Sequence, residues 1–509
     1  MAQYNSSEIT NIFWASNEGF KGGRDPLGIQ NSSIATYSKL IPGLTNLTSH
    51  IRYYSLYCWL LSEYDKFKEE KSTTLHQYNF IRRAELAMAL IMKDMGVGAV
   101  VGAMFVFQGR YKLKEEGVYD IADGADYESK EKYWTFKSGA LGQYYLGSLI
   151  YYGLVKIEEN RFYLRDRGKE LADAVRDSIG DNIRQLFLEC ILSGTLKEED
   201  REKLKDLAIC SIKVGSSEWN YLNNLLIKKD GNSSFRRETI FLLLSDIKKG
   251  VKIQDFIKNR FLNVAEYSDM NATFGWYFYY LCECLHYSID LFFCLILDKI
   301  YELHNPPMEI LSQEIRKSIM NVIMKDENCT SQISLSEWKN GIIEGIDIVY
   351  DRLRENVKKQ DYVLAGVCAM KLMLRLCTEY EDEEIRKSIE EFEKENDLKR
   401  QRGIFIQGIT SYVQKYLSYS ISDFIEMLIE QIMQEHIVVA IAKMGKNNSD
   451  LRKFIFEDGR VVLVEQRYPV ETSPRINSLF NFLKDMGYID FQNELTEIAE
   501  NFINNYGKE

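Results

Sequence analysis

Three residues near the C-terminus have the types and order of a metal-dependent nuclease site. Asp458 would lie on one strand and Glu465 and Arg467 on the next, where carboxylates hold a divalent ion that activates water. Such sites carry a lysine at the third place, and arginine differs because it cannot be deprotonated. Asp458 also falls in the Asp-Gly turn of a predicted hairpin. A metal-dependent nuclease is therefore one alternative, beside ordinary surface charges on a hairpin.

A second group that could do chemistry lies in the apolar segment 276–297. Cys282 and His286 are one helical turn apart, so both could reach one zinc ion, but Cys284 points elsewhere and no second ligand pair follows. We therefore predict buried thiols on a core helix and no metal site. Charged residues interrupt this segment on one helix face, which favours a buried helix over a membrane span.

Further ligand or interface candidates lie near the N-terminus. The loop 19–24 is glycine-rich and ends in Arg24, so it could present backbone N–H groups and cations to a phosphate, and the alternative is a plain flexible loop. His50 and Arg52 precede a run of aromatic residues, where the alternative is a structural contact at a helix start. The chain contains no P-loop, no G-x-G-x-x-G after a strand, no H-E-x-x-H, no G-x-S-x-G and no C-x-x-C motif. We therefore expect no catalytic residues and no cofactor.

The elements around residues 138–176 give the best functional lead. A predicted helix ends at Gly153, a short hairpin follows to Leu164, and Asp166 begins another helix, which is the layout of the second half of a winged-helix domain. Residues 130–176 carry nine basic and six acidic side chains, a local charge of +3. The predicted nucleic-acid contacts are Ser138, Gln143, Tyr144, Arg161, Arg165 and Arg167.

A similar layout returns at the C-terminus. Residues 474–486 predict a helix, Gly487 ends it, and a shorter wing leads into a last helix. Residues 471–509 carry three basic and seven acidic side chains, a local charge of −4 that should repel DNA. This second unit is therefore predicted to bind protein.

Composition sets the broad class. The 509 residues are 45% hydrophobic and 27% charged, with a net charge of −11 and nine cysteines in no repeated spacing. These values predict a globular protein of a reducing cytoplasm. The first residues have neither a basic nor an apolar region, so we expect no signal peptide, and the charges within 276–297 argue against a membrane segment. We expect a mainly α-helical, multi-domain chain with two winged-helix units. The predicted divisions are a loop-rich segment 1–74, a winged-helix domain 75–180, a helical middle 181–420 and a winged-helix domain 421–509.

A resemblance covers about forty residues of the N-terminal region, between Asp25 and Trp59. The turns Asp25-Pro26-Leu27-Gly28 and Leu40-Ile41-Pro42-Gly43 and the aromatic helix that starts at His50-Ile51-Arg52-Tyr53-Tyr54 resemble the N-terminal signature of large bacterial proteins encoded in phage-defence islands. The resemblance implies a bacterial, cytosolic, defence-linked protein and transfers no catalytic residue. In plan alone, two winged helices around a helical middle are similar to kleisins, which bridge SMC ATPase heads.

Together these observations predict a non-catalytic subunit of a bacterial anti-phage defence or DNA-maintenance system. It would contact duplex DNA through the first wing and recruit a protein partner, such as an ATPase or helicase of the same system, through the C-terminal unit. The alternatives are the nuclease and a kleisin-like assembly scaffold without DNA affinity.

Overall fold

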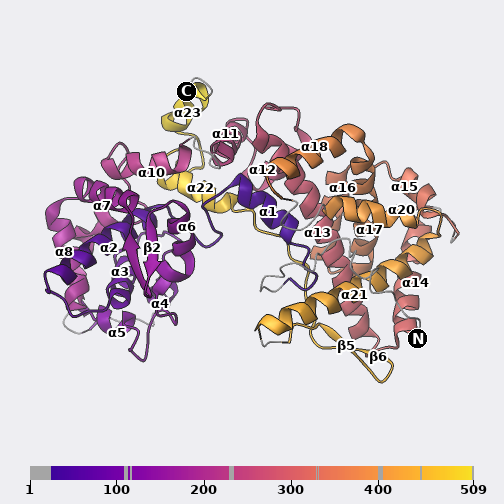
Figure 1. The fold of residues 1–509 in the computed structure, drawn as a ribbon, viewed down its shortest axis with the longest axis horizontal. Helices are drawn as coiled ribbons and strands as arrows, with labels where there is room; N and C mark the ends of the chain where they lie inside the picture. The colour runs from indigo at the N-terminus through magenta and orange to yellow at the C-terminus, as the bar shows by residue number, and fades with distance from the viewer. Residues whose placement is uncertain are drawn as a thin grey trace. The chain divides into compact units, whose positions relative to one another are not determined.

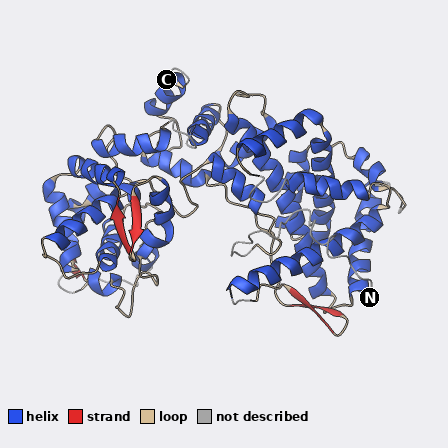
Figure 2. Cartoon of the chain, viewed as in Figure 1, coloured by secondary structure: helices blue, strands red, loops and turns tan. Residues whose placement is uncertain are grey.

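The chain is mainly α-helical, as predicted. The computed structural model describes residues 25–107, 113–114, 117–228, 234–327, 330, 332–398, 405–447 and 450–506. Within them, the strands form three two-stranded antiparallel sheets, and helices make up most of the rest (Figure 2).

Contacts divide the chain into two compact units, each assembled from separate segments. Unit 1 contains the described residues of Met1–Lys39 and Ile257–Thr472, and unit 2 those of Leu40–Phe256 and Ser473–Glu509. This division is coarser than the four segments expected from the sequence, which stay a prediction.

Unit 1 is built around one long apolar helix, α13 (Asn271–Glu302), against which α14 (Met308–Glu327), α17 (Tyr362–Glu381), α20 (Phe405–Lys415) and α21 (Ile421–Asn447) pack (Figure 1). The remaining helices of this unit are α1 (Asn31–Leu40), α12 (Phe256–Leu262), α15 (Leu335–Gly341), α16 (Ile346–Lys358) and α18 (Glu383–Glu395). Helix α13 is long and apolar enough to cross a membrane, but its most apolar window is entirely buried in the protein. A helix that is apolar on all sides needs neighbours on all sides, and here helices provide them, as the sequence predicted.

Unit 1 also holds the hairpin of β5 (Phe454–Glu457) and β6 (Arg460–Leu463), which pairs Phe454 with Leu463 and Glu457 with Arg460. The turn residues Asp458 and Gly459 have φ angles of 48° and 72°, the left-handed values that a two-residue turn of type I′ requires. The hairpin predicted between Arg452 and Tyr468 is confirmed.

Unit 2 is organised around α2 (Arg52–Glu69), whose residues from Arg52 to Leu61 are all buried. Helices α3 (Gln77–Ile91), α7 (Asp166–Ser178) and α10 (Ser217–Ile227) pack on it. Shorter or flanking elements complete the unit: α4 (Ala103–Phe107), β1 (Val118–Tyr119), α5 (Ile121–Ala125), the π-helical turn η1 (Leu141–Tyr145), α6 (Leu146–Tyr151), β2 (Val155–Glu158), β3 (Arg161–Leu164), α8 (Asp181–Ser193), β4 (Leu196–Lys197), α9 (Glu198–Lys203), the 3₁₀ turns η2 (Lys205–Leu207) and η4 (Ile253–Asp255), α11 (Ser234–Lys248), α22 (Ile476–Asp485) and α23 (Glu497–Asn505).

Candidate nucleic-acid interface

The hairpin of β2 and β3 forms where the sequence predicts it, directly after Gly153. Val155 pairs with Leu164 and Glu158 with Arg161. Glu159 and Asn160 at its tip have φ angles of 48° and 62°, so this turn is also of type I′.

A residue of helix α3 holds this hairpin against the helices of unit 2 by hydrogen bonds. The side-chain amide of Gln77 donates to the carbonyl of Phe162 at 2.9 Å and accepts from its N–H at 2.9 Å. An amide side chain thus substitutes for a third strand on the free edge of β3, and the position of the hairpin is set by buried bonds.

The three arginines predicted to contact DNA differ in how free their charges are. Arg161 pairs with Asp65 at 3.3 Å and lies over the ring of Tyr163, 5.0 Å from its centroid. Arg165 and Arg167 are exposed and form no ion pair with any described residue. Two full positive charges therefore stand next to the hairpin, where β3 leads into α7.

The other three predicted contacts precede the hairpin. Gln143 is exposed and accepts a hydrogen bond from the indole of Trp134 at 2.8 Å, while the ring of Tyr144 meets the same indole edge-on. Ser138 is half-buried, and its carbonyl accepts from the N–H of Gly142 at 3.2 Å. Ser138, Gln143 and Tyr144 carry no positive charge, so among the six predicted contacts the charge comes from the arginines alone.

The buried carboxylate of Glu85, which belongs to no sequence motif, positions the π-helical turn η1. Glu85 accepts from the hydroxyls of Tyr57, at 2.7 Å, and Tyr133, and from the N–H groups of Ala140 and Leu141 at 3.1 and 3.0 Å. Burial raises the pKa of Glu85, and the four hydrogen bonds oppose the shift without cancelling it. The carboxylate thereby caps the start of η1, a π-helical turn of the kind often found at functional sites.

His50 is buried and bonded at both ring nitrogens. Its Nδ1 lies 3.1 Å from Asp485 of α22, and its Nε2 lies 2.9 Å from the carbonyl of Gly98. The N–H of Ile51 donates to the same carboxylate at 3.1 Å. His50 therefore ties the start of α2 to the C-terminal segment of unit 2.

Arg52 is also buried and hydrogen-bonded to neighbouring groups. Its guanidinium binds Glu218 with two hydrogen bonds of 3.1 and 3.0 Å and donates to the carbonyls of Asp206 and Ala208. His50 and Arg52 thus make the structural contacts at a helix start that were the alternative to a ligand role. Arg24, the third candidate ligand, and the rest of the loop 19–24 lie outside the described residues.

The predicted C-terminal wing, which follows Gly487, contains less β-structure than the β2–β3 hairpin. Gly487 ends α22 with a φ of 74°, and the loop up to α23 contains a single β-bridge between Ile489 and Leu495. Asp490 closes this loop by accepting from the N–H groups of Gln492 and Glu494. Phe491 at its tip is 94% exposed.

Two of the three nuclease candidates have separate ion-pair partners. Asp458 sits in the turn of β5–β6, Glu465 pairs with Lys453, and Arg467 pairs with Asp290. In the described part of the chain, no group of three His, Cys, Asp or Glu side chains is arranged to hold a metal ion.

Two buried carboxylates of α13, Asp290 and Glu283, are hydrogen-bonded by the segment that follows β6. Asp290 binds Arg467 and the N–H of Val470, at 3.1 Å, and Glu283 accepts from the N–H and hydroxyl of Thr472 at 2.6 Å each. Arg467, which neutralises Asp290, belongs to an irregular segment. The contacts of Asp290 and Glu283 thus fix the path of residues 467–472 across α13.

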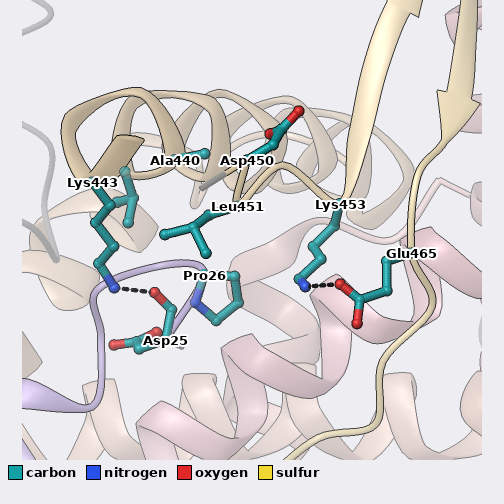
Figure 3. Close-up of a pocket in the computed structure, with 9 residues that line it drawn as sticks. Asp25, Pro26, Ala440, Lys443, Asp450, Leu451, Lys453 and Glu465 are labelled. Carbon is teal, nitrogen blue, oxygen red and sulfur yellow. Dashed lines mark hydrogen bonds and ion pairs between the residues drawn. The ribbon is translucent and has the colours of Figure 1, made fainter. Parts of the chain in front are cut away.

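Unit 1 also contains a pocket of about 330 Å³ between α21, the hairpin and Pro26. Its cations are paired within the wall: Lys443 donates to the carbonyl of Asp25, and Lys453 pairs with Glu465 (Figure 3). Carboxylate and lysine side chains both line the pocket, so it presents charges of both signs.

Comparison with protein-family models, with curated proteins and with solved structures found no match to this chain.

Proposed function

We propose that this chain is a non-catalytic protein of a bacterial anti-phage defence or DNA-maintenance system that contacts duplex DNA through the β2–β3 wing. The observation that carries the proposal is the pair of exposed arginines, Arg165 and Arg167, which have no ion-pair partner among the described residues at the junction of the wing and α7. The order of helix, hairpin and helix is that of the second half of a winged-helix domain. In this arrangement the wing meets the phosphate backbone, and arginine supplies the charge.

Salt dependence of DNA binding tests this proposal. We expect the purified chain to bind a labelled duplex at micromolar or lower Kd, with an affinity that falls steeply with salt. Replacing Arg161, Arg165 and Arg167 by alanine should weaken binding and flatten the plot of log K against log salt by about 0.9 for each phosphate that is no longer neutralised.

A matched control removes three positive charges elsewhere. Lys358, Lys359 and Lys387 are exposed on or directly beside helices of unit 1, and their replacement by alanine changes the net charge equally. The control should bind DNA as the parent chain does. The proposed function would be refuted if the parent chain did not bind DNA at low salt. It would also be refuted if the triple arginine variant bound DNA as tightly as the parent chain.

We further propose that the C-terminal loop recruits the protein partner, such as an ATPase or helicase. Phe491 is 94% exposed in a region of net negative charge, which disfavours DNA and suits a protein interface. Co-purification of an ATPase activity from source cells should be lost with Phe491→Ala. It should be kept with Phe456→Ala, which removes a phenylalanine of unit 1 that is 55% exposed.

A further inference from the structure

A small pocket in unit 2 is lined by three cationic residues. Arg167, Lys228 and Arg236 line it together with Tyr151, Tyr152 and Asn224, and no carboxylate is among the described lining residues. Its volume of about 110 Å³ is well below the roughly 300–1,000 Å³ of typical organic-ligand sites. The pocket therefore suits one small anionic group.

Arg236 carries the argument because its charge is buried and has no carboxylate partner among the described residues. The side chain is 2% exposed and forms no ion pair with any described residue. Buried guanidinium groups ordinarily pair with a carboxylate, since an isolated charge in the interior is costly. A bound anion would supply the counter-charge that no described residue provides.

The protein holds this guanidinium in place with carbonyls. Arg236 donates to the carbonyls of Pro42, Leu226 and Leu225 at 2.8, 2.9 and 2.7 Å, and it lies over the ring of Tyr152. Three of its five N–H groups are used in this way, and two have no acceptor among the described residues. The charge is fixed in position while donors remain for a ligand.

The loop that carries Pro42 is shaped for this site. Gly43 has a φ of 82°, and a Cβ atom there would lie 2.6 Å from the ring of Tyr151 and 2.8 Å from that of Tyr152. The Pro-Gly turn thus both supplies a carbonyl to Arg236 and leaves room for the two tyrosines at the pocket.

We propose that this pocket binds a phosphate group. Arg236 would bind it from the buried side, and Arg167 and Lys228 would bind it from the exposed rim of the pocket. A guanidinium presents paired donors that match a phosphate, and charge-assisted bonds of this kind are strong. The phosphate is supplied either by the nucleic-acid backbone or by a free phosphate compound. The inference goes beyond the proposed function, because it requires a phosphate and not DNA.

Inorganic phosphate is the probe, titrated into the full chain against chloride at equal ionic strength and pH. We expect phosphate to raise the melting temperature of the parent chain above the chloride value. The rim variant Arg167→Ala with Lys228→Ala should bind phosphate about tenfold more weakly by calorimetry, while the control Lys169→Ala with Lys197→Ala should bind it as the parent does. Both control lysines are exposed and lie outside the pocket.

A response to phosphate no larger than that to chloride, or a rim variant that responds as the parent does, overturns the site. Arg236→Gln should abolish phosphate binding, and because this buried change also lowers stability, the rim variant supplies the deciding comparison.

Competition with a labelled duplex separates the two sources of phosphate. If phosphate displaces DNA from the parent chain, the backbone occupies the pocket, and Arg165→Ala should then weaken DNA without changing phosphate affinity. If phosphate binds and DNA is not displaced, a free phosphate compound is the ligand. Absence of DNA binding with phosphate binding intact refutes the proposed function and leaves this site standing.

Discussion

Glu435 is a buried carboxyl group whose two oxygens have no hydrogen-bond partner among the described residues. Burial, reinforced by the charge of Asp25, raises the pKa of Glu435 to about 9. The carboxyl group is therefore protonated in the folded state at neutral pH, but it ionises near its ordinary pKa of 4.5 in the unfolded chain. Because the folded pKa is raised, this carboxyl group costs no stability below pH 4.5 and destabilises the fold increasingly as the pH rises from 4.5 towards 9.

Replacing Glu435 by glutamine tests this argument. The amide keeps the shape of the protonated acid and does not ionise, so we expect Glu435→Gln to stabilise the protein by about 3 kcal/mol at pH 7 and by little at pH 5. Urea unfolding at the two pH values measures the difference. Glu383→Gln, at an exposed position of α18, should show no such pH dependence. Parallel pH profiles for Glu435→Gln and the parent chain would refute the assignment.

The ion pair of His50 and Asp485 should make the stability of unit 2 depend on pH. Burial lowers the pKa of His50, but the hydrogen bond and charge of Asp485 outweigh it and leave that pKa above 6.5. A raised histidine pKa stabilises the fold fully below pH 6.5, and the contribution disappears as the pH rises through the folded value. We expect Asp485→Asn to cost about 2 kcal/mol at pH 6 and clearly less at pH 9, measured by thermal unfolding. An equal cost at both values would contradict this pairing.

At the scale of elements, the two hairpins have the same turn type and different turn residues. Glu159-Asn160 closes β2–β3 and Asp458-Gly459 closes β5–β6, all with positive φ. A glutamate side chain is disfavoured at positive φ, whereas Asp-Gly is among the preferred pairs for a type I′ turn.

A reciprocal exchange of the two turns should therefore change stability in opposite directions. We expect Glu159→Asp with Asn160→Gly to stabilise β2–β3 by about 1 kcal/mol, and Asp458→Glu with Gly459→Asn to destabilise β5–β6 by a similar amount. Amide hydrogen exchange of each hairpin measures the effect. Slower exchange in both hairpins, or in neither, would count against the turn argument.

Local elements were predictable from the sequence, because their signals are local. The hairpin at 154–164, that at 454–463 and the buried helix around 276–297 all follow from residue patterns within one segment. The sites that depend on distant partners were not. Glu85 looks like any other helical glutamate until Tyr133 and the start of η1 are brought to it, and Arg236 lies in a segment whose residue pattern indicates only a helix. The π-helical form of η1 also left no local pattern.

At the scale of the whole molecule, each unit depends on chain segments that are far apart. The described C-terminal residues from Ser473 onwards belong to unit 2, and Leu479, Phe482 and Leu483 of α22 are fully buried there. Trp219 also donates to the carbonyl of Met486 at 2.9 Å. Unit 2 therefore needs its C-terminal segment for a complete core.

Truncation after Thr472 should consequently disrupt unit 2 and spare unit 1. We expect hydrogen-exchange protection to fall along α2 and α3 and to persist along α13 and α17. A chain that ends at Thr496 keeps α22 and Asp485 and should retain protection along α2. Unchanged protection of α2 in the shorter chain would show that unit 2 is complete without its last segment.

The bond between His50 and Asp485 joins residues 435 positions apart, and this sets an order of events during synthesis on the ribosome. At about 5–20 residues per second, α2 emerges roughly 20–90 s before the helix that completes its surroundings. The segment 257–472 of unit 1 is translated in that interval, so unit 1 has its full sequence before unit 2 does. The side of the Tyr54 ring that contacts Phe482 therefore stays uncovered until α22 has been synthesised.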